Sequence, residues 1–304
     1  MTLFFLPIHF VLHFEWPIVV DTLPLFILRS MLGKELHSMS CIAQQNKCPE
    51  CMYNKTCAYA FLFETILPSE NEITPGRDRA SHPFVFSRGA FKTNKKISDY
   101  AFTITLLGKA VDYLPYIYAS FVQAGKAGIF MERVPFSVTN VSVGKENILI
   151  DSGYLDTSIA RKAWTYDKTL ANKTGEVLIE LRSPLRFKHG GTYGEDFTAR
   201  DFFSCLYRRM KTICLLYGNK EDLIEYQPSE SISIIEENLF WQDNNHYSAR
   251  QKKNMSLGGI TGTLKLSGTF SAAEQNLLEF ARLFSAGKNT NFGLGQLDFW
   301  PRWE

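Results

Sequence analysis

The 304-residue sequence has no run of about 18 apolar residues, the least that a membrane-spanning helix needs. Its apolar N-terminus, residues 1–20, contains no lysine or arginine and is interrupted by His9, His13 and Glu15. A secretory signal combines an early positive charge with an unbroken apolar segment, so the sequence argues against one. We therefore expect a cytoplasmic protein with no membrane partner.

Several catalytic signatures are missing as well. The sequence contains no Ser-His-Asp signature, no Walker A loop and no paired-carboxylate metal motif. The glycine-rich segment 287–295 fails the Walker pattern because Lys288 follows its first glycine and not its second. The missing Walker lysine argues against a free nucleotide as ligand.

The chain carries little net charge, +2, which gives weak overall attraction to nucleic acid. The distribution is uneven: residues 180–220 hold eight Lys/Arg against four Asp/Glu, residues 221–245 hold seven acidic and no basic residues, and the basic excess returns after 246. This pattern suits a local basic surface. Solvated helix faces would produce the same pattern.

The first half of the chain reads as strand, helix, strand pair, helix and strand. Alternation at the N-terminus places Phe10 and Leu12 on one face of a first strand and His9 on the other. The remaining elements are predicted as helices over 25–39 and 112–124 and as strands over 59–67, 84–88, 100–107 and 136–143. This order is that of the split βαβ, or ferredoxin-like, unit.

The same order repeats after a polar linker at 157–174. The second set comprises strands over 176–187, 231–241, 257–270 and 297–300 and helices that begin at Thr198 and Ser271, each with an acidic residue three positions on, as in a capping box. We predict an α+β protein with two tandem ferredoxin-like (RRM-like) domains. Residues 1–160 form the first, with a cysteine-rich zinc-knuckle insertion, and residues 170–304 form the second, with the glycine-rich loop.

Four of the six cysteines fall within 17 residues, spaced C-x6-C-x2-C-x5-C: Cys41, Cys48, Cys51 and Cys57. Four thiolates match a closed tetrahedral zinc site of structural character, with no position left for a catalytic water. An iron–sulfur cluster and loosely held thiols are the alternatives. Cys205 and Cys214 lie elsewhere at a spacing that suggests burial.

The glycine-rich segment offers a ligand class, phosphate. Glycine adds no side chain and tolerates positive φ, so backbone N–H groups at Gly287, Gly293 and Gly295 can approach an anion. Lys288 and Asn289 add polar side chains to the same loop.

Two polar clusters contain candidate catalytic groups. His37 follows Lys34 by three residues near the end of the first helix, so both share a face. An imidazole beside an ammonium suits proton transfer and charge stabilisation in phosphodiester cleavage, although a surface histidine at a helix end is equally common.

The second cluster lies at 246–253. It contains His246, Tyr247, Arg250, Lys252 and Lys253, groups that suit phosphate and ribose contacts. His189, beside a glycine pair, fits either a phosphate contact or a simple turn.

Three segments, in this order, resemble the CRISPR-associated endoribonucleases of the RAMP superfamily, which cut precursor CRISPR RNA at its repeats. They are LRSPLRFK at 181–188, YSARQ at 247–251 with GGITG at 258–262, and GKNTNFGLG at 287–295. The first helix, the cysteine loop and the segment 59–64 resemble a branch of that family with a four-cysteine N-terminal loop.

The resemblance implies tandem ferredoxin-like domains and metal-independent cleavage, in which the ribose 2′-OH attacks the adjacent phosphate and leaves 2′,3′-cyclic phosphate and 5′-OH ends. It implies His37 as general base and Lys34 as electrostatic helper, with His246 and Tyr247 in reserve. The implied RNA contacts are Arg182, Lys188, Arg250, Lys252, Lys253, Gly287, Lys288, Asn289, Gly293 and Gly295. The implied partners are CRISPR repeat RNA, the retained crRNA product and subunits of a CRISPR effector complex.

Three functions therefore compete. The first is a repeat-cleaving endoribonuclease that keeps its product, and the second is a non-catalytic RNA-binding RAMP subunit of an effector complex. The third is a zinc-stapled scaffold with no role in RNA binding.

Overall fold

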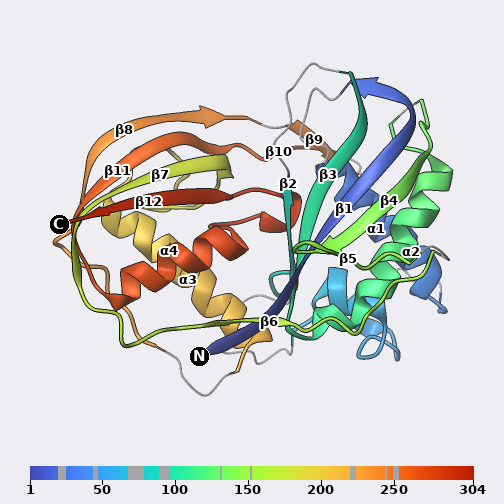
Figure 1. The fold of residues 1–304 in the computed structure, drawn as a ribbon, viewed down its shortest axis with the longest axis horizontal. Helices are drawn as coiled ribbons and strands as arrows, with labels where there is room; N and C mark the ends of the chain where they lie inside the picture. Colours follow the sequence, from blue (N-terminus) through green and yellow to red (C-terminus); the bar gives the residue numbers. More distant parts are fainter. Residues whose placement is uncertain are drawn as a thin grey trace. The chain divides into compact units, whose positions relative to one another are not determined.

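The computed structural model describes residues 1–19, 25–43, 47–67, 79–88, 96–130, 132–150, 153–219, 224–243, 245–248 and 253–304. The chain divides into two compact units (Figure 1). The N-terminal unit is Phe4–Ala163, and the C-terminal unit combines Trp164–Glu304 with Met1–Leu3. The first residues belong to the C-terminal unit because the carbonyl of Met1 accepts the N–H of Tyr166 at 3.0 Å.

The N-terminal unit contains an antiparallel sheet in the order β2-β3-β1-β4-β5, with α1 packed against α2. Its strands are β1 (Thr2–Val19), β2 (Phe84–Arg88), β3 (Lys96–Leu107), β4 (Phe136–Val143) and β5 (Glu146–Asn147). Its α-helices are α1 (Leu25–Ser40) and α2 (Leu114–Ala127), and the short helical turns η1 (Cys48–Glu50), η2 (Ala60–Glu64) and η3 (Gly108–Tyr113) complete it.

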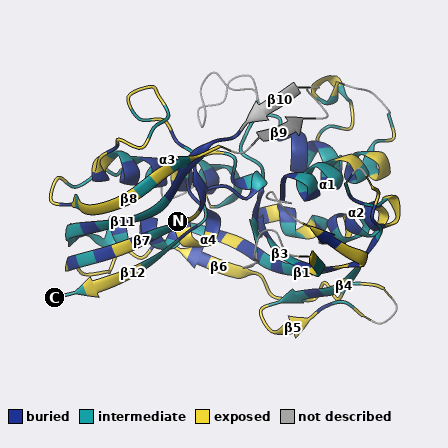
Figure 2. Ribbon diagram, turned by 90° about the horizontal axis from the view of Figure 1, so that it is seen from above, coloured by how far each residue is buried: buried dark blue, intermediate teal, exposed yellow. Residues whose placement is uncertain are grey.

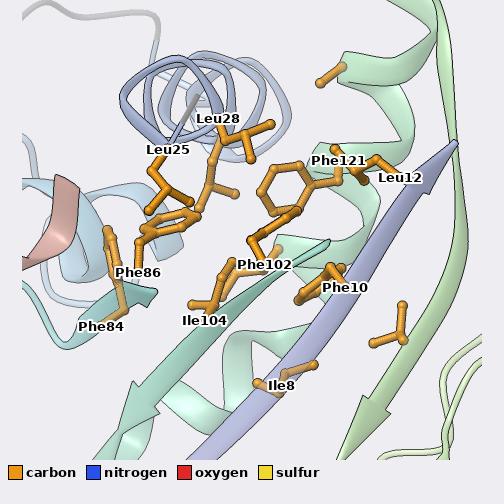
Figure 3. Close-up of a cluster of buried hydrophobic side chains, with 14 of the residues drawn as sticks. Ile8, Phe10, Leu12, Leu25, Leu28, Phe84, Phe86, Phe102, Ile104 and Phe121 are labelled. Atoms are coloured by element: carbon orange, nitrogen blue, oxygen red, sulfur yellow. The ribbon is translucent and has the colours of Figure 1, made fainter. Parts of the chain in front are cut away.

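The alternation of β1 produces the core of this unit, as the sequence predicts. Phe10 and Leu12 are fully buried, whereas the neighbouring His9 is only partly buried. The ring of Phe10 lies 5.4 Å from that of Phe102 on β3 and 5.4 Å from that of Phe121 on α2 (Figure 3). A single aromatic stack thus ties the central strand to its neighbour and to the covering helix.

The strand predicted over 59–67 is wrong, because these residues form the π-helical turn η2. The N–H of Thr65 bonds the carbonyl of Ala60 at 2.8 Å, five residues back. Apolar residues occupy nearly every position of this segment, and periodicity cannot distinguish a short apolar helix from a buried strand. The buried Glu64 lies 2.9 Å from the guanidinium of Arg79, which neutralises it.

The C-terminal unit has a four-stranded antiparallel sheet in the order β12-β7-β11-β8, and α3 packs against α4 on one face of it (Figure 1). Its sheet strands are β7 (Lys173–Leu185), β8 (Ser233–Gln242), β11 (Gly259–Phe270) and β12 (Leu297–Trp303). Its helices are α3 (Ala199–Tyr217), α4 (Ala272–Phe284) and the short turn η4 (Thr290–Phe292). Both predicted capping boxes are present, at Thr198 with Asp201 and at Ser271 with Glu274.

Four short strands were not expected from the sequence. They are β5, β6 (Lys162–Thr165) and the hairpin of β9 (Asn245–Ser248) with β10 (Lys253–Ser256). The short β6 falls in the predicted linker, where few apolar residues signal it. Burial alternates along β7 of the C-terminal sheet, with the more exposed residues on the face opposite the helices (Figure 2).

Each unit follows the chain order βαββαβ, and its fourth strand pairs with its first. The strand order across each sheet is therefore fourth, first, third, second. The predicted α+β class and tandem split-βαβ arrangement are confirmed in this topology. Among the described residues, no helix is long and apolar enough to cross a membrane.

Replacing Phe10 with alanine should lower the free energy of unfolding by about 3–5 kcal/mol, because it leaves a cavity among three packed rings. Urea denaturation measures the difference. Phe4→Ala is the matched control: Phe4 lies on the same strand but is 47% exposed, so the destabilisation should be much smaller. Equal destabilisation by the two variants would contradict the assignment of Phe10 to the core.

Candidate nucleic-acid interface

Beyond its last sheet residue, β7 continues into a tight turn. His189 and Thr192 exchange two backbone hydrogen bonds, of 3.1 and 3.0 Å, around Gly190 and Gly191. Both glycines have positive φ, 53° and 86°, as a type I′ hairpin turn requires. The turn brings Tyr193 back beside the end of β7.

The glycine-rich loop connects α4 to β12 and is fastened to the end of β7. The N–H of Lys288 bonds the carbonyl of Arg186 at 2.8 Å, and the N–H of Gly295 bonds that of Pro184 at 3.0 Å. Asn289 is in the left-handed region with φ 63°, just before η4. The loop is therefore an extension of the sheet edge and not a free segment.

Two of the loop glycines are required by close backbone contacts. A Cβ at Gly295 would lie 1.9 Å from the carbonyl oxygen of Ala286, and one at Gly287 would lie 2.5 Å from that of Arg186. Both residues also have positive φ, 75° and 72°. These glycines, together with the buried Gly293, let the loop close on itself and on β7.

Three cations from these segments surround one tyrosine ring. The guanidinium carbon of Arg186 lies 4.0 Å from the centroid of Tyr193, and the ammonium nitrogens of Lys188 and Lys288 lie 5.3 and 5.8 Å from it. We call Arg186, Lys188 and Lys288 the basic cluster. None of the three forms an ion pair with an acidic side chain within the described part of the chain.

The basic cluster has the electrostatics of an anion site. The tyrosine face attracts the cations through its quadrupole but leaves their charge unneutralised. Arg186 is further held by a 2.6 Å hydrogen bond from Nη1 to the carbonyl of Gly258. Fixed, unpaired positive charges beside a tyrosine suit a sugar-phosphate backbone.

The other predicted contact residues lie apart from this cluster or beyond what the structure describes. Arg182 lies 2.6 Å from the carboxylate of Asp298 on the open face of the sheet. Lys253 begins β10, where its backbone pairs with Ser248 on β9. Arg250 and Lys252 lie outside the described residues, and the side chains of His246, Tyr247 and Lys253 are likewise not described.

In the N-terminal unit, His37 packs against an aromatic side chain. Its ring meets that of Tyr59 edge to face, with the centroids 4.7 Å apart, and Tyr59 stacks on Phe63 at 5.6 Å. Neither ring nitrogen of His37 has a hydrogen-bond partner among the described residues. Lys34 is 77% exposed, and its ammonium lies 3.5 Å from the carboxylate of Glu35.

Two family models match the chain. One describes an N-terminal domain, AF_1859_N, and matches residues 3–161, just over half of the chain, so the first half belongs to that domain family. The other describes the CRISPR-associated endoribonuclease Cas6 and matches residues 179–297, which include the basic cluster and the glycine-rich loop. Residues 179–297 of the chain thus belong to the Cas6 family of CRISPR-associated endoribonucleases.

Solved Cas6 structures share this fold. Cas6 of Thermus thermophilus matches with a TM-score of 0.54 and 14% identity over 98% of this chain and 99% of that one. A Cas6 product complex matches with a TM-score of 0.54 and 15% identity over 97% of this chain and 100% of that one. A partial Cas6-RT-Cas1–Cas2 complex matches with a TM-score of 0.53 and 11% identity over 99% of this chain and 46% of that one. No curated protein sequence matches.

The Cas6 match contains two residues that the sequence reading missed, Arg186 and Tyr193. Arg186 and Lys188 are two positions apart at the end of a strand, so they share a face, which is a readable signal. The position of Tyr193 depends on the glycine turn. The resemblance to a four-cysteine branch of the family stays a prediction.

The four cysteines of the N-terminal loop line one cavity of about 160 Å³ at the end of α1. Burial, reinforced by the carboxylate of Glu64 and by the other three thiols, raises the pKa of the Cys48 thiol. Among the described residues, no three of the possible ligand side chains already form a metal site. The predicted zinc knuckle is thus not seen as a preformed ligand set.

Replacing both Lys188 and Lys288 with alanine should weaken RNA binding and make the slope of log K against log salt shallower by roughly 0.7 for each phosphate that the variant no longer neutralises. A filter-binding titration at several salt concentrations measures both. Lys173→Ala is the control, because Lys173 is exposed at the opposite end of β7. A salt slope that stays at the wild-type value would contradict this location for the interface.

Proposed function

We propose that the chain cleaves precursor CRISPR RNA within its repeats and retains the product. The observation that carries this proposal is the basic cluster: three unpaired cations around one tyrosine, beside a loop fixed to the sheet edge, inside the region that matches Cas6. The similarity in fold to a structure described as a Cas6 product complex is consistent with product retention.

The proposed chemistry needs no metal ion. The ribose 2′-oxygen attacks the adjacent phosphorus while its proton passes to a general base. The bond from phosphorus to the 5′-oxygen breaks, and that oxygen takes up a proton, which leaves a 2′,3′-cyclic phosphate and a 5′-OH. The protein must supply a base, a proton donor and positive charge near the phosphate.

We assign the general base to His37. Its ring is oriented by the edge-to-face contact with Tyr59, and its nitrogens form no hydrogen bond with the described residues, so they can accept a proton from a substrate. Lys34 is the proposed electrostatic helper. To stabilise the phosphate, its ammonium would have to leave the carboxylate of Glu35. His246 and Tyr247 are the reserve candidates.

Cleavage of repeat RNA in EDTA tests the function, and His37→Ala tests the base. We expect wild-type protein to cut in EDTA and the variant to fall on the order of 10²–10⁴-fold in single-turnover rate with little change in affinity. His13→Ala is the control, since His13 is exposed and pairs with Asp99.

Three outcomes would revise the proposal. An unchanged rate for His37→Ala would move the role of base to His246 or Tyr247. Tight binding without any cleavage by the wild type would favour the non-catalytic RNA-binding subunit of an effector complex. Absence of salt-sensitive RNA binding would leave the scaffold function.

We also infer a structural zinc ion bound by Cys41, Cys48, Cys51 and Cys57. The four thiols share one small cavity, and four sulfur donors suit a closed tetrahedral site. The sulfurs would have to move together on binding, which is common because metal affinity and local folding are coupled. The ion would fasten the loop to the end of α1 and take no part in cleavage.

Purified protein should contain about one zinc ion per chain, and Cys48→Ser with Cys51→Ser should release the metal and lower the melting temperature. Elemental analysis and thermal denaturation give the two values. Cys214→Ala, which removes a buried thiol of the C-terminal unit, should keep the metal. Protein without metal that zinc fails to stabilise, or that contains iron instead, would contradict the inference.

A further inference from the structure

Arg209 on α3 is a buried cation without a counter-charge. Its side chain is 8% exposed, and its Nη2 donates to the hydroxyl of Thr290 at 2.7 Å and to the carbonyl of Phe284 at 3.5 Å. Its Nε has no hydrogen-bond partner in the part of the chain that the structure describes. Among the described residues, no carboxylate pairs with it.

Such a charge is costly to bury. Desolvation lowers the pKa of Arg209 to about 10, so the group is still charged at neutral pH. The carbonyl of Phe284 is the last of α4, and the partial negative charge at a helix C-terminus compensates the guanidinium only in part. A well-packed apolar side chain would avoid this desolvation penalty.

The position of the charge links it to the glycine-rich loop. Thr290 starts η4 in that loop, two residues after Lys288 of the basic cluster. One helical turn before Arg209 on α3, the thiol of Cys205 lies near the backbone N–H of Gly287. One face of α3 therefore packs beneath the loop, and Arg209 is a charged residue on that face.

We propose that Arg209 is a positioning residue of the RNA site, and that its uncompensated charge beneath the loop strengthens binding of a phosphate on the loop's outer side. The inference rests on the proposed RNA-binding function. Bound RNA supplies the negative charge that the folded chain lacks. Because little water separates a buried charge from the loop, the attraction is weakly screened.

The stability and the affinity should therefore change in opposite senses. Arg209→Met and Arg209→Gln remove the charge, and the second keeps an N–H donor for Thr290. We expect both to bind a 2′-O-methylated repeat oligonucleotide, which cannot be cleaved by 2′-OH attack, about tenfold more weakly, or about 1.4 kcal/mol. Without RNA, the melting temperature of Arg209→Met should equal or exceed that of the wild type.

Arg209→Lys keeps the charge and should bind within about threefold of the wild type, a difference below 1 kcal/mol. Arg200→Met is the control: it removes a positive charge from the same helix, but Arg200 is exposed and lies 3.6 Å from Glu230. It should leave affinity and stability unchanged. If Arg209→Met fails to fold, the comparison of the glutamine and lysine variants decides.

Equal RNA binding by all variants would overturn the inference. It would also be overturned if the lysine and glutamine variants bound RNA equally weakly and both had lower melting temperatures, because that result would indicate a purely structural residue. If the wild type does not bind the oligonucleotide, the proposed function fails. The affinities of the same variants for inorganic polyphosphate are then measured instead. Tenfold weaker binding there would still support the role of Arg209. No binding of polyphosphate by the wild type would overturn it.

Discussion

The C-terminal site depends on backbone hydrogen bonds that continue past the end of β7. Pro184 and Arg186 present carbonyls that accept the N–H groups of Gly295 and Lys288, so the glycine-rich loop is held where another strand would lie. Beside these bonds, Gly287 approaches the carbonyl of Arg186, and Gly295 that of Ala286, more closely than a Cβ allows. The spacing of the loop glycines is thus a packing constraint, and the placement of Lys288 beside Arg186 follows from it.

Cations in the described part of the chain differ in whether a carboxylate pairs with them. Arg79 with Glu64 and Arg182 with Asp298 lie within 3 Å of a carboxylate and so carry little free charge. The basic cluster and Arg209 have no such partner among the described residues. Lys288 lies on the glycine-rich loop, Arg186 and Lys188 lie beside it, and Arg209 donates to its Thr290. Natural surfaces seldom gather unpaired cations without an anionic ligand, which is why this loop, and not the open sheet face, is the proposed RNA contact.

The sequence predicts most of the fold because strand alternation and helix caps are local signals. The faces of β1 and the capping boxes at Thr198 and Ser271 follow from residues at most three positions apart. The π-turn at 60–64 was missed because its uniformly apolar sequence has no period. The position of Tyr193 and the packing of the loop on Arg209 depend on tertiary contacts, which no local pattern contains.

The structure also changes the explanation of how the glycine-rich loop would bind phosphate. The sequence suggests backbone N–H groups open to an anion, yet those of Lys288 and Gly295 form hydrogen bonds with Arg186 and Pro184 at the end of β7. Affinity for phosphate must then come mainly from side-chain charge, held in place by a rigid backbone. A rigid loop gives up little conformational entropy when RNA binds, so more of the electrostatic attraction is retained as affinity. Rigidity of the loop and burial of Arg209 therefore serve the same end.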